Sequence, residues 1–264
     1  FRKMDLKDEA AMAEIFEEQH FDAVCHLAAQ AGVRYSLINP FAYQKANLEG
    51  FLNLLELAKR HEAERFVYAS SSSVYGGLTE LPFSEEQRVA SPISLYAATK
   101  RANELMAHTY SHLFRLATVG LRLFTVYGPW GRPDMALFLF TRAILAGEPI
   151  NVFNHGRMRR DFTYIDDIID GCIKVIDHPN AKDLYQIYNI GNNAPVQLMD
   201  FIKALENSLG KEAKKEYLPM QPGDVKSTYA DVSGLMNDFD YKPNTSIQEG
   251  VDKFAQWYRA FYHL

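Results

Sequence analysis

The chain has 264 residues, a formal net charge of −5, an apolar content of 47% and two cysteines. This composition is typical of a globular enzyme, and its acidic balance gives no reason to expect a nucleic-acid partner. Two cysteines exclude a disulfide framework and a cysteine-rich metal centre, and no apolar run approaches the ~20 residues that span a bilayer. No signal peptide is visible, so we expect a cytoplasmic protein without a metal or a membrane partner.

Short apolar strands alternate with amphipathic helices in the first half of the chain. Helices are expected at 8–19, 41–60 and 94–113, and strands at 22–27, 65–69 and 117–123. Apolar strands between such helices are typical of a parallel sheet covered on both faces. The fold class is therefore α/β, a doubly wound parallel sheet, and ligands of such sheets bind at the carboxyl ends of the strands.

The pattern changes beyond Gly128. Pro129, Gly131 and Pro133 interrupt the alternation. Shorter, mixed elements follow, with helices expected at 134–146, 165–177, 198–209 and 246–262 and strands near 150–153, 160–164 and 185–190. We expect a first domain at 1–128 and a smaller mixed α/β lobe at 129–264, intertwined with it.

Tyr96 and Lys100 stand 25 and 29 residues after Ser71. Helix positions i and i+4 share one face, so the ammonium of Lys100 can lie beside the phenol of Tyr96. A fixed cation favours the phenolate, and moving a phenol pKa from about 10 to about 7 takes roughly 4 kcal/mol. This pattern predicts a base for an alcohol proton, although Tyr-x-x-x-Lys also occurs as an exposed pair on unrelated helices.

Seven segments occur in an order and at a spacing that are specific as a set. They are HLAAQAGVRYS, ASSSSVYG, SLYAATK, LRLFTVYGPWGRPDMA, RRDFTYIDD, YNIGN and LPMQPGDV. Together they resemble the extended short-chain dehydrogenase/reductase family, and within it the NAD-dependent nucleotide-sugar epimerases, most closely the bacterial UDP-glucuronate 4-epimerases. The resemblance implies a Rossmann-like NAD-binding domain and a UDP-sugar-binding lobe.

One feature departs from that family. Its members begin with a strand, a Gly-x-x-Gly-x-x-Gly turn and a helix that hold the cofactor pyrophosphate, and this glycine pattern does not occur here. The chain starts at Phe1, and Asp5-Leu6 match a pair that follows two strand–helix units in the family. We therefore expect roughly 60 residues to be absent at about 30 per unit.

The resemblance assigns roles residue by residue. It makes Tyr96 the base, Lys100 its activator and a ligand of the nicotinamide ribose, and Ser71 the hydrogen-bond partner of the sugar C4 oxygen. The positions that match cofactor contacts are Asp5, Leu6, Leu27, Ala28, Ala29, Ala31, Asn47, Tyr96, Lys100 and Phe124. Arg160 matches the diphosphate-binding arginine, and Asp224 matches a position near the nucleotide ribose.

The substrate is predicted from three hydroxyl side chains and one arginine. Related dehydratases carry Asp-Glu where Ser72-Ser73 stand, and related decarboxylases carry a glutamate at Ser73. Serine cannot replace those acids, whereas Ser72, Ser73 and Thr125 can donate to a carboxylate and Arg132 can add charge. A uronic acid is therefore favoured, with exposure in a Pro-rich loop as the alternative for Arg132.

Three alternatives remain open. The chain could be a UDP-glucose or UDP-N-acetylglucosamine 4-epimerase, a cofactor-binding relative without catalysis, or an inactive fragment. Retention of Ser71, Tyr96 and Lys100 argues against the second. The resemblance also implies a homodimer through helices 41–60 and 94–113, whose apolar faces burial on the sheet would explain equally well.

Overall fold

The structure is a computed structural model that describes residues 1–178, 183–221 and 225–264. Its contacts divide the chain into two compact units. The first comprises Phe1–Thr79, Glu85–Leu123 and Cys172–Asn189, and the second comprises Glu80–Ser84, Phe124–Gly171 and Ile190–Leu264. These boundaries differ from the expected 1–128 and 129–264, since 172–189 belong to the first unit and 124–128 to the second. The roles expected for the two domains remain predictions.

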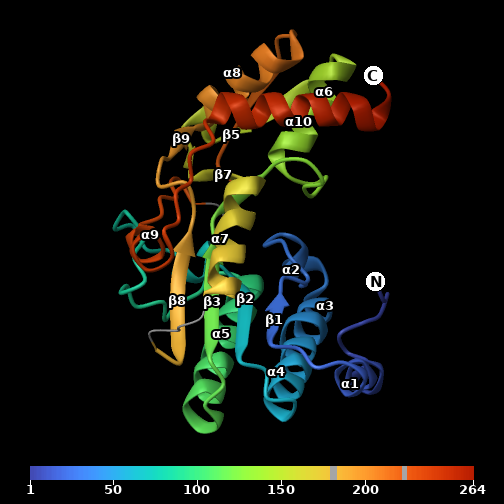
Figure 1. Cartoon of the computed structure of the whole chain (residues 1–264). Helices are drawn as coiled ribbons and strands as arrows, with labels where there is room; N and C mark the ends of the chain where they lie inside the picture. Colours follow the sequence, from blue (N-terminus) through green and yellow to red (C-terminus); the bar gives the residue numbers. More distant parts are fainter. Residues whose placement is uncertain (179–182, 222–224) are drawn as a thin grey trace. The chain divides into compact units, whose positions relative to one another are not determined.

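A four-stranded sheet organises the first unit (Figure 1). Its strands lie in the order β1 (Ala23–His26), β2 (Arg65–Ser71), β3 (Thr118–Leu123) and β8 (Tyr185–Ile190). The pairs β1–β2 and β2–β3 are parallel, with Ala23 opposite Arg65 and Phe66 opposite Thr118. The carboxyl ends of β1, β2 and β3 therefore meet at one edge of the sheet.

Helices of the first unit cover this sheet with apolar faces. They are α1 (Glu9–Glu18), α2 (Tyr35–Ile38), α3 (Pro40–Tyr43), α4 (Gly50–Arg60) and α5 (Leu95–Phe114). In α4 the buried side chains recur at helical spacing, as Phe51, Leu54, Leu55 and Ala58 show. They join β2, α1 and α5 in one core that includes Phe66.

The helix expected at 41–60 is interrupted. A π-helical turn at Gln44–Glu49 joins α3 to α4 and contains Asn47, which is 1% exposed. The Asn47 side chain accepts from the N–H of Gln30 at 2.8 Å and donates to its carbonyl oxygen at 3.0 Å. Turns of this kind are rare and recur at functional sites. Here the turn ties the helix to the loop after β1.

The second unit consists of short paired strands and helices. β4 (Thr125–Tyr127) pairs in parallel with β7 (Phe162–Tyr164), and β10 (Lys214–Leu218) with β5 (Pro149–Phe153). β6 (Arg159–Arg160) runs antiparallel to β9 (Val196–Gln197). The helices are α6 (Ala136–Ala146), α8 (Leu198–Leu209), α9 (Ser233–Phe239) and α10 (Ile247–Tyr262). α6, α8 and α10 share a core that includes Phe138, Phe201 and Phe254.

Helix α7 (Ile165–Asp177) begins in the second unit and ends in the first. Within the first unit, the guanidinium of Arg65 on β2 donates to the carbonyl of Val175 at 2.7 Å and to that of Ile176 at 3.2 Å. Across the described ranges, no helix is both long enough and apolar enough to cross a membrane.

Candidate functional site

Ser71 ends strand β2 and starts the turn that carries the neighbouring serines. It is 7% exposed, and its Oγ accepts from the N–H of Ser73 at 3.2 Å. That bond begins a 3₁₀ turn, Ser72–Tyr75, in which Ser72 and Ser73 are half-buried. Because Ser71 Oγ serves this turn as an acceptor, its own O–H can donate to a ligand oxygen at the sheet edge.

Tyr96 lies in the first turn of α5. The hydroxyl of Ser94 caps this helix by accepting from the N–H of Ala97 at 3.1 Å. Tyr96 is half-buried, and its ring meets that of Tyr43 edge-on at a centroid distance of 6.2 Å. The positive end of the helix dipole lies here and favours a negative charge on a nearby oxygen.

Lys100 connects the Tyr96 helix to the Ser71 strand. The residue is 3% exposed, and its ammonium donates to the carbonyl of Ala69 at 2.7 Å. Burial lowers the pKa of Lys100 to about 8, so the side chain is still mostly protonated at neutral pH. The charged ammonium of Lys100 is therefore held at the backbone of Ala69, two residues before Ser71. The lysine itself lies one helical turn after Tyr96.

His26 ends strand β1 near this ammonium. It is 4% exposed, and its ring lies 5.5 Å from that of Phe51. Burial, and next the positive charge of Lys100, lower the pKa of His26 to about 4. The imidazole is therefore neutral at pH 7 and does not compete with Lys100 as the cation at this edge.

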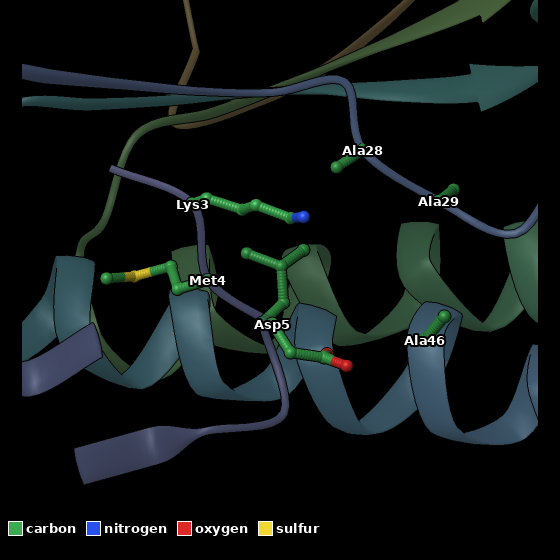
Figure 2. Close-up of a pocket in the computed structure, with 7 residues that line it drawn as sticks. Lys3, Met4, Asp5, Ala28, Ala29 and Ala46 are labelled. Carbon is green, nitrogen blue, oxygen red and sulfur yellow. The ribbon is translucent and has the colours of Figure 1, made fainter. Parts of the chain in front are cut away.

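A pocket of about 520 Å³ opens beside the loop after β1. Figure 2 shows three segments around it, namely the N-terminal segment, the loop after β1 and the π-helical turn. The lining residues are Lys3, Met4, Asp5, Leu6, Ala28, Ala29 and Ala46. Alanine side chains let a flat ring approach closely, and the Asp5 carboxylate can accept from an amino or hydroxyl group. The N–H of Lys7 first, and then its ammonium, lower the pKa of Asp5, which stays ionised. These residues fit the adenosine part of a dinucleotide.

Close contact with helix α4 fixes the Asp5–Leu6 segment. A Cβ on Gly50 would lie 2.9 Å from Cβ of Leu6, so only glycine permits this approach. The amide of Asn53 donates to the carbonyl of Leu6 at 2.9 Å. The wall of the pocket that carries Asp5 thus depends on Gly50.

Replacing Gly50 by alanine is expected to weaken binding of NAD or AMP by roughly tenfold, about 1.4 kcal/mol. The added methyl displaces Leu6, and Asp5 moves with it. Isothermal titration with AMP measures the effect, and Gly77→Ala is the control because a Cβ there meets only Ile93 Cγ2 at 4.0 Å. Unchanged AMP affinity in Gly50→Ala would show that this wall does not contact the nucleotide.

The other predicted cofactor residues of the first unit lie on or under the same loop. Leu27, Ala28 and Ala29 are exposed, and Ala31 is half-buried. Asn47 lies beneath them. Besides its two bonds to Gln30, it donates to Oγ1 of Thr99 at 3.0 Å. The amide of Asn47 therefore ties the loop after β1 to helix α5.

The predicted site residues that the structure describes in the second unit lie in three segments. Phe124 is 5% exposed, and Thr125 is half-buried at the start of β4. The exposed Arg132 makes a two-pronged ion pair with Asp134, with 3.1 Å between Arg132 Nε and Asp134 Oδ1. Arg160 is half-buried in β6 and donates to the carbonyl of Arg159 at 2.9 Å. Asp224 lies outside the described residues.

Asp161 holds the strand that carries Arg160, a role the sequence analysis missed. The side chain is fully buried and accepts from the N–H groups of Asn192 at 2.7 Å and Ala230 at 3.1 Å. Burial raises its pKa despite these bonds. The sequence signal was the position of Asp161 between Arg160 and the apolar Phe162, which indicates a buried carboxylate. A buried carboxylate requires several hydrogen-bond donors, and here they are backbone N–H groups.

Glu104 and Arg122 were also missed. Glu104 follows Lys100 by one helical turn, is 0% exposed and receives Nε of Arg122 at 2.9 Å and Nη2 at 3.1 Å. Burial alone would raise the pKa of Glu104, but the guanidinium of Arg122 outweighs it and the pKa is lowered. The sequence signal was Arg122, which stands between Leu121 and Leu123 in an apolar strand. A charged residue in a buried strand is expected to pair with a buried group of opposite charge.

Comparisons with known proteins identify the family and the fold. Residues 1–191 match the NAD dependent epimerase/dehydratase family. UDP-glucuronate 4-epimerase 3 of Arabidopsis thaliana is 47% identical over 98% of this chain and 64% of its own length. The UDP-glucuronic acid 4-epimerase of Bacillus cereus, solved with UDP-glucuronic acid and NAD, superposes with a TM-score of 0.90 at 34% identity over 98% of this chain and 81% of that one. The UDP-glucose 4-epimerase of Thermotoga maritima gives a TM-score of 0.92 at 27% identity over 99% of this chain and 85% of that one. The expected Rossmann-like α/β fold is confirmed.

Proposed function

The chain belongs to the NAD dependent epimerase/dehydratase family, and from this we propose that it interconverts UDP-glucuronate and UDP-galacturonate by inverting C4. Its relatives establish the coarser activity, that of an NAD-dependent UDP-sugar epimerase. The observation that carries the finer proposal is the all-hydroxyl turn Ser71–Ser73 at the end of β2. It has no carboxylate that could eliminate water or assist decarboxylation.

The cofactor's place follows from the pocket in the first unit. Asp5, Leu6 and the loop bearing Ala28 and Ala29 would hold its adenosine part. When bound, NAD supplies the oxidation of the sugar at C4 and the reduction that follows. The chain contributes the proton transfers and the placement of the sugar.

Tyr96 removes the proton of the C4 hydroxyl and later returns it. The charge of Lys100 and the N-terminal end of α5 both favour the phenolate form. Ser71 donates to the C4 oxygen and keeps it aligned with the phenol. General acid–base action of this kind contributes about 10²–10⁴-fold, and positioning contributes the remainder.

A 4-keto uronate is a β-keto acid and readily loses CO₂. Holding the carboxylate so that its bond to C5 stays near the plane of the carbonyl suppresses this loss. We assign that grip to the hydroxyls of Ser72, Ser73 and Thr125, with Arg132 adding charge. The ion pair of Arg132 with Asp134 must loosen for the guanidinium to take part.

The nucleotide is held by phosphate and ribose contacts. Arg160 is the proposed diphosphate ligand, because a guanidinium can bind phosphate oxygens with two parallel bonds. The buried Asp161 fixes the backbone beside it. Asp224 is proposed for the ribose region on family resemblance alone.

Incubation with UDP-glucuronate and NAD is expected to give UDP-galacturonate with little CO₂. Thr125→Val should raise KM for the acid sugar about 10- to 100-fold, the value of one hydrogen bond to a charged group, and should release CO₂. Chromatography of the products and trapping of CO₂ measure both effects.

The control is Thr109→Val, which makes the same change at an exposed position on α5. Faster turnover of UDP-glucose than of UDP-glucuronate by the unaltered protein would favour the activity of the Thermotoga maritima neighbour. A Thr125→Val protein with unchanged product and specificity would remove the carboxylate grip.

A further inference from the structure

A buried chain of polar contacts surrounds the serine turn of the first unit. At its centre is the ion pair of Glu104 on α5 and Arg122 on β3, with side-chain exposures of 0% and 3%. Enclosed ion pairs add little net stability over apolar residues of the same volume. The stability of the core therefore does not explain why this pair is present, and its contacts with neighbouring residues suggest another role.

Glu104 contacts the chain immediately before the turn. Its Oε1 accepts from the hydroxyl of Ser70 at 2.6 Å. Ser70 lies between Ala69, whose carbonyl receives the ammonium of Lys100, and Ser71. Helix α5 thus holds two successive residues of β2, with side chains one helical turn apart.

Arg122 contacts the last residue of the 3₁₀ turn. Its Nη1 donates to the hydroxyl of Tyr75 at 3.1 Å, and that hydroxyl donates to Oδ1 of Asn189 at 2.7 Å. Tyr75 is 2% exposed and closes the 3₁₀ turn. The two sides of one ion pair therefore reach the residues that flank Ser71–Ser73.

We infer that Glu104 and Arg122 are positioning residues that fix the Ser71 hydroxyl relative to the helix carrying Tyr96 and Lys100. This inference rests on the proposed function for its catalytic consequence. Ser70 and Tyr75 transmit the constraint through the backbone, and the side chains of all four residues are buried. Displacing a hydrogen-bond donor by about 1 Å can cost 10²-fold in rate.

Ser70→Ala tests the inference because it removes one hydroxyl and leaves the ion pair in place. We expect kcat to fall about tenfold with KM for the UDP-sugar within twofold, the signature of lost alignment. In a Ser71→Ala background, Ser70→Ala should have no further effect on kcat, because it acts through Ser71. Ser70→Thr, which keeps a hydroxyl, should recover most of the rate.

Amide hydrogen exchange gives a second readout that needs no turnover. Exchange at Ser73, whose N–H bonds Ser71 Oγ, should accelerate in Ser70→Ala. Ser111→Ala is the matched control, since Ser111 makes a buried 2.8 Å hydroxyl bond from the same helix to Thr118 on β3, away from the turn. It should leave both kcat and the exchange at Ser73 unchanged.

Two results would overturn the inference. One is an equal loss of kcat from Ser70→Ala with and without Ser71, and the other is unchanged exchange at Ser73. If the unaltered protein turned over neither UDP-glucuronate nor UDP-glucose, the proposed function would instead be rejected. The exchange measurement would still decide whether the turn is held.

Discussion

Replacing Tyr96 by phenylalanine is expected to lower kcat by about 10²–10⁴-fold while the affinity for UDP stays within about twofold. The substitution removes the only atom proposed to carry the C4 proton. The ring and its edge-on contact with Tyr43 are kept. Turnover measured by product chromatography and UDP affinity measured by calorimetry separate chemistry from binding.

Tyr262→Phe provides the control for this result. Its ring is 47% exposed on α10, and the same hydroxyl deletion there should change neither quantity. If Tyr96→Phe kept near-normal turnover, another group would be the base and the mechanism would have to be rebuilt around it.

The second large effect is expected on stability. Glu104→Gln should lower the free energy of unfolding by about 3–5 kcal/mol, because it leaves the guanidinium of Arg122 enclosed without a compensating charge. Urea titration followed by circular dichroism measures the loss. Removing both charges together, as Glu104→Met with Arg122→Met, should cost less than Glu104→Gln alone.

Glu249→Gln breaks an exposed helical ion pair with Lys253 and serves as the reference. It should leave the free energy of unfolding almost unchanged, since exposed pairs contribute little. A Glu104→Gln protein as stable as this reference would show that the charge of Glu104 is not needed to compensate the enclosed guanidinium of Arg122.

Local pattern was enough to locate the regular elements along the chain, although it assigned strand 185–190, which is β8, to the second lobe rather than to the sheet of the first unit. The expected strand 65–69 is β2, Arg65–Ser71, and the expected helix 94–113 is α5, Leu95–Phe114. Apolar runs bounded by polar residues identify buried strands, and Ser94 marks the start of α5 because its hydroxyl caps the first turn.

Long-range contacts account for what the pattern missed. The π-helical turn at 44–49 interrupts a continuous amphipathic pattern and is associated with the bonds of Asn47 to Gln30, 17 residues earlier. β10, Lys214–Leu218, carries mostly polar side chains and exists because it pairs with β5. Neither feature has a signal within its own segment.

Some residues of the candidate site could likewise be predicted from the sequence, whereas the role of others depends on long-range contacts. Ser71, Tyr96 and Lys100 follow from spacing and family resemblance, and the structure joins their elements through the Lys100–Ala69 bond. The part played by Ser70 and Tyr75 depends on Glu104 and Arg122, which lie on a different helix and a different strand. Such a network becomes visible only when those elements are brought together in three dimensions.

The threading of the chain through its two units limits how this enzyme can be divided or recombined. Strand β8 completes the sheet of the first unit from beyond residue 184, after the chain has already built part of the second unit. Cutting the gene between the codons for Leu123 and Tyr185 would separate strands β1, β2 and β3 from β8, which completes the sheet. Exchange of a contiguous segment would therefore disrupt this sheet, whereas a substitution within a loop leaves its strands in place.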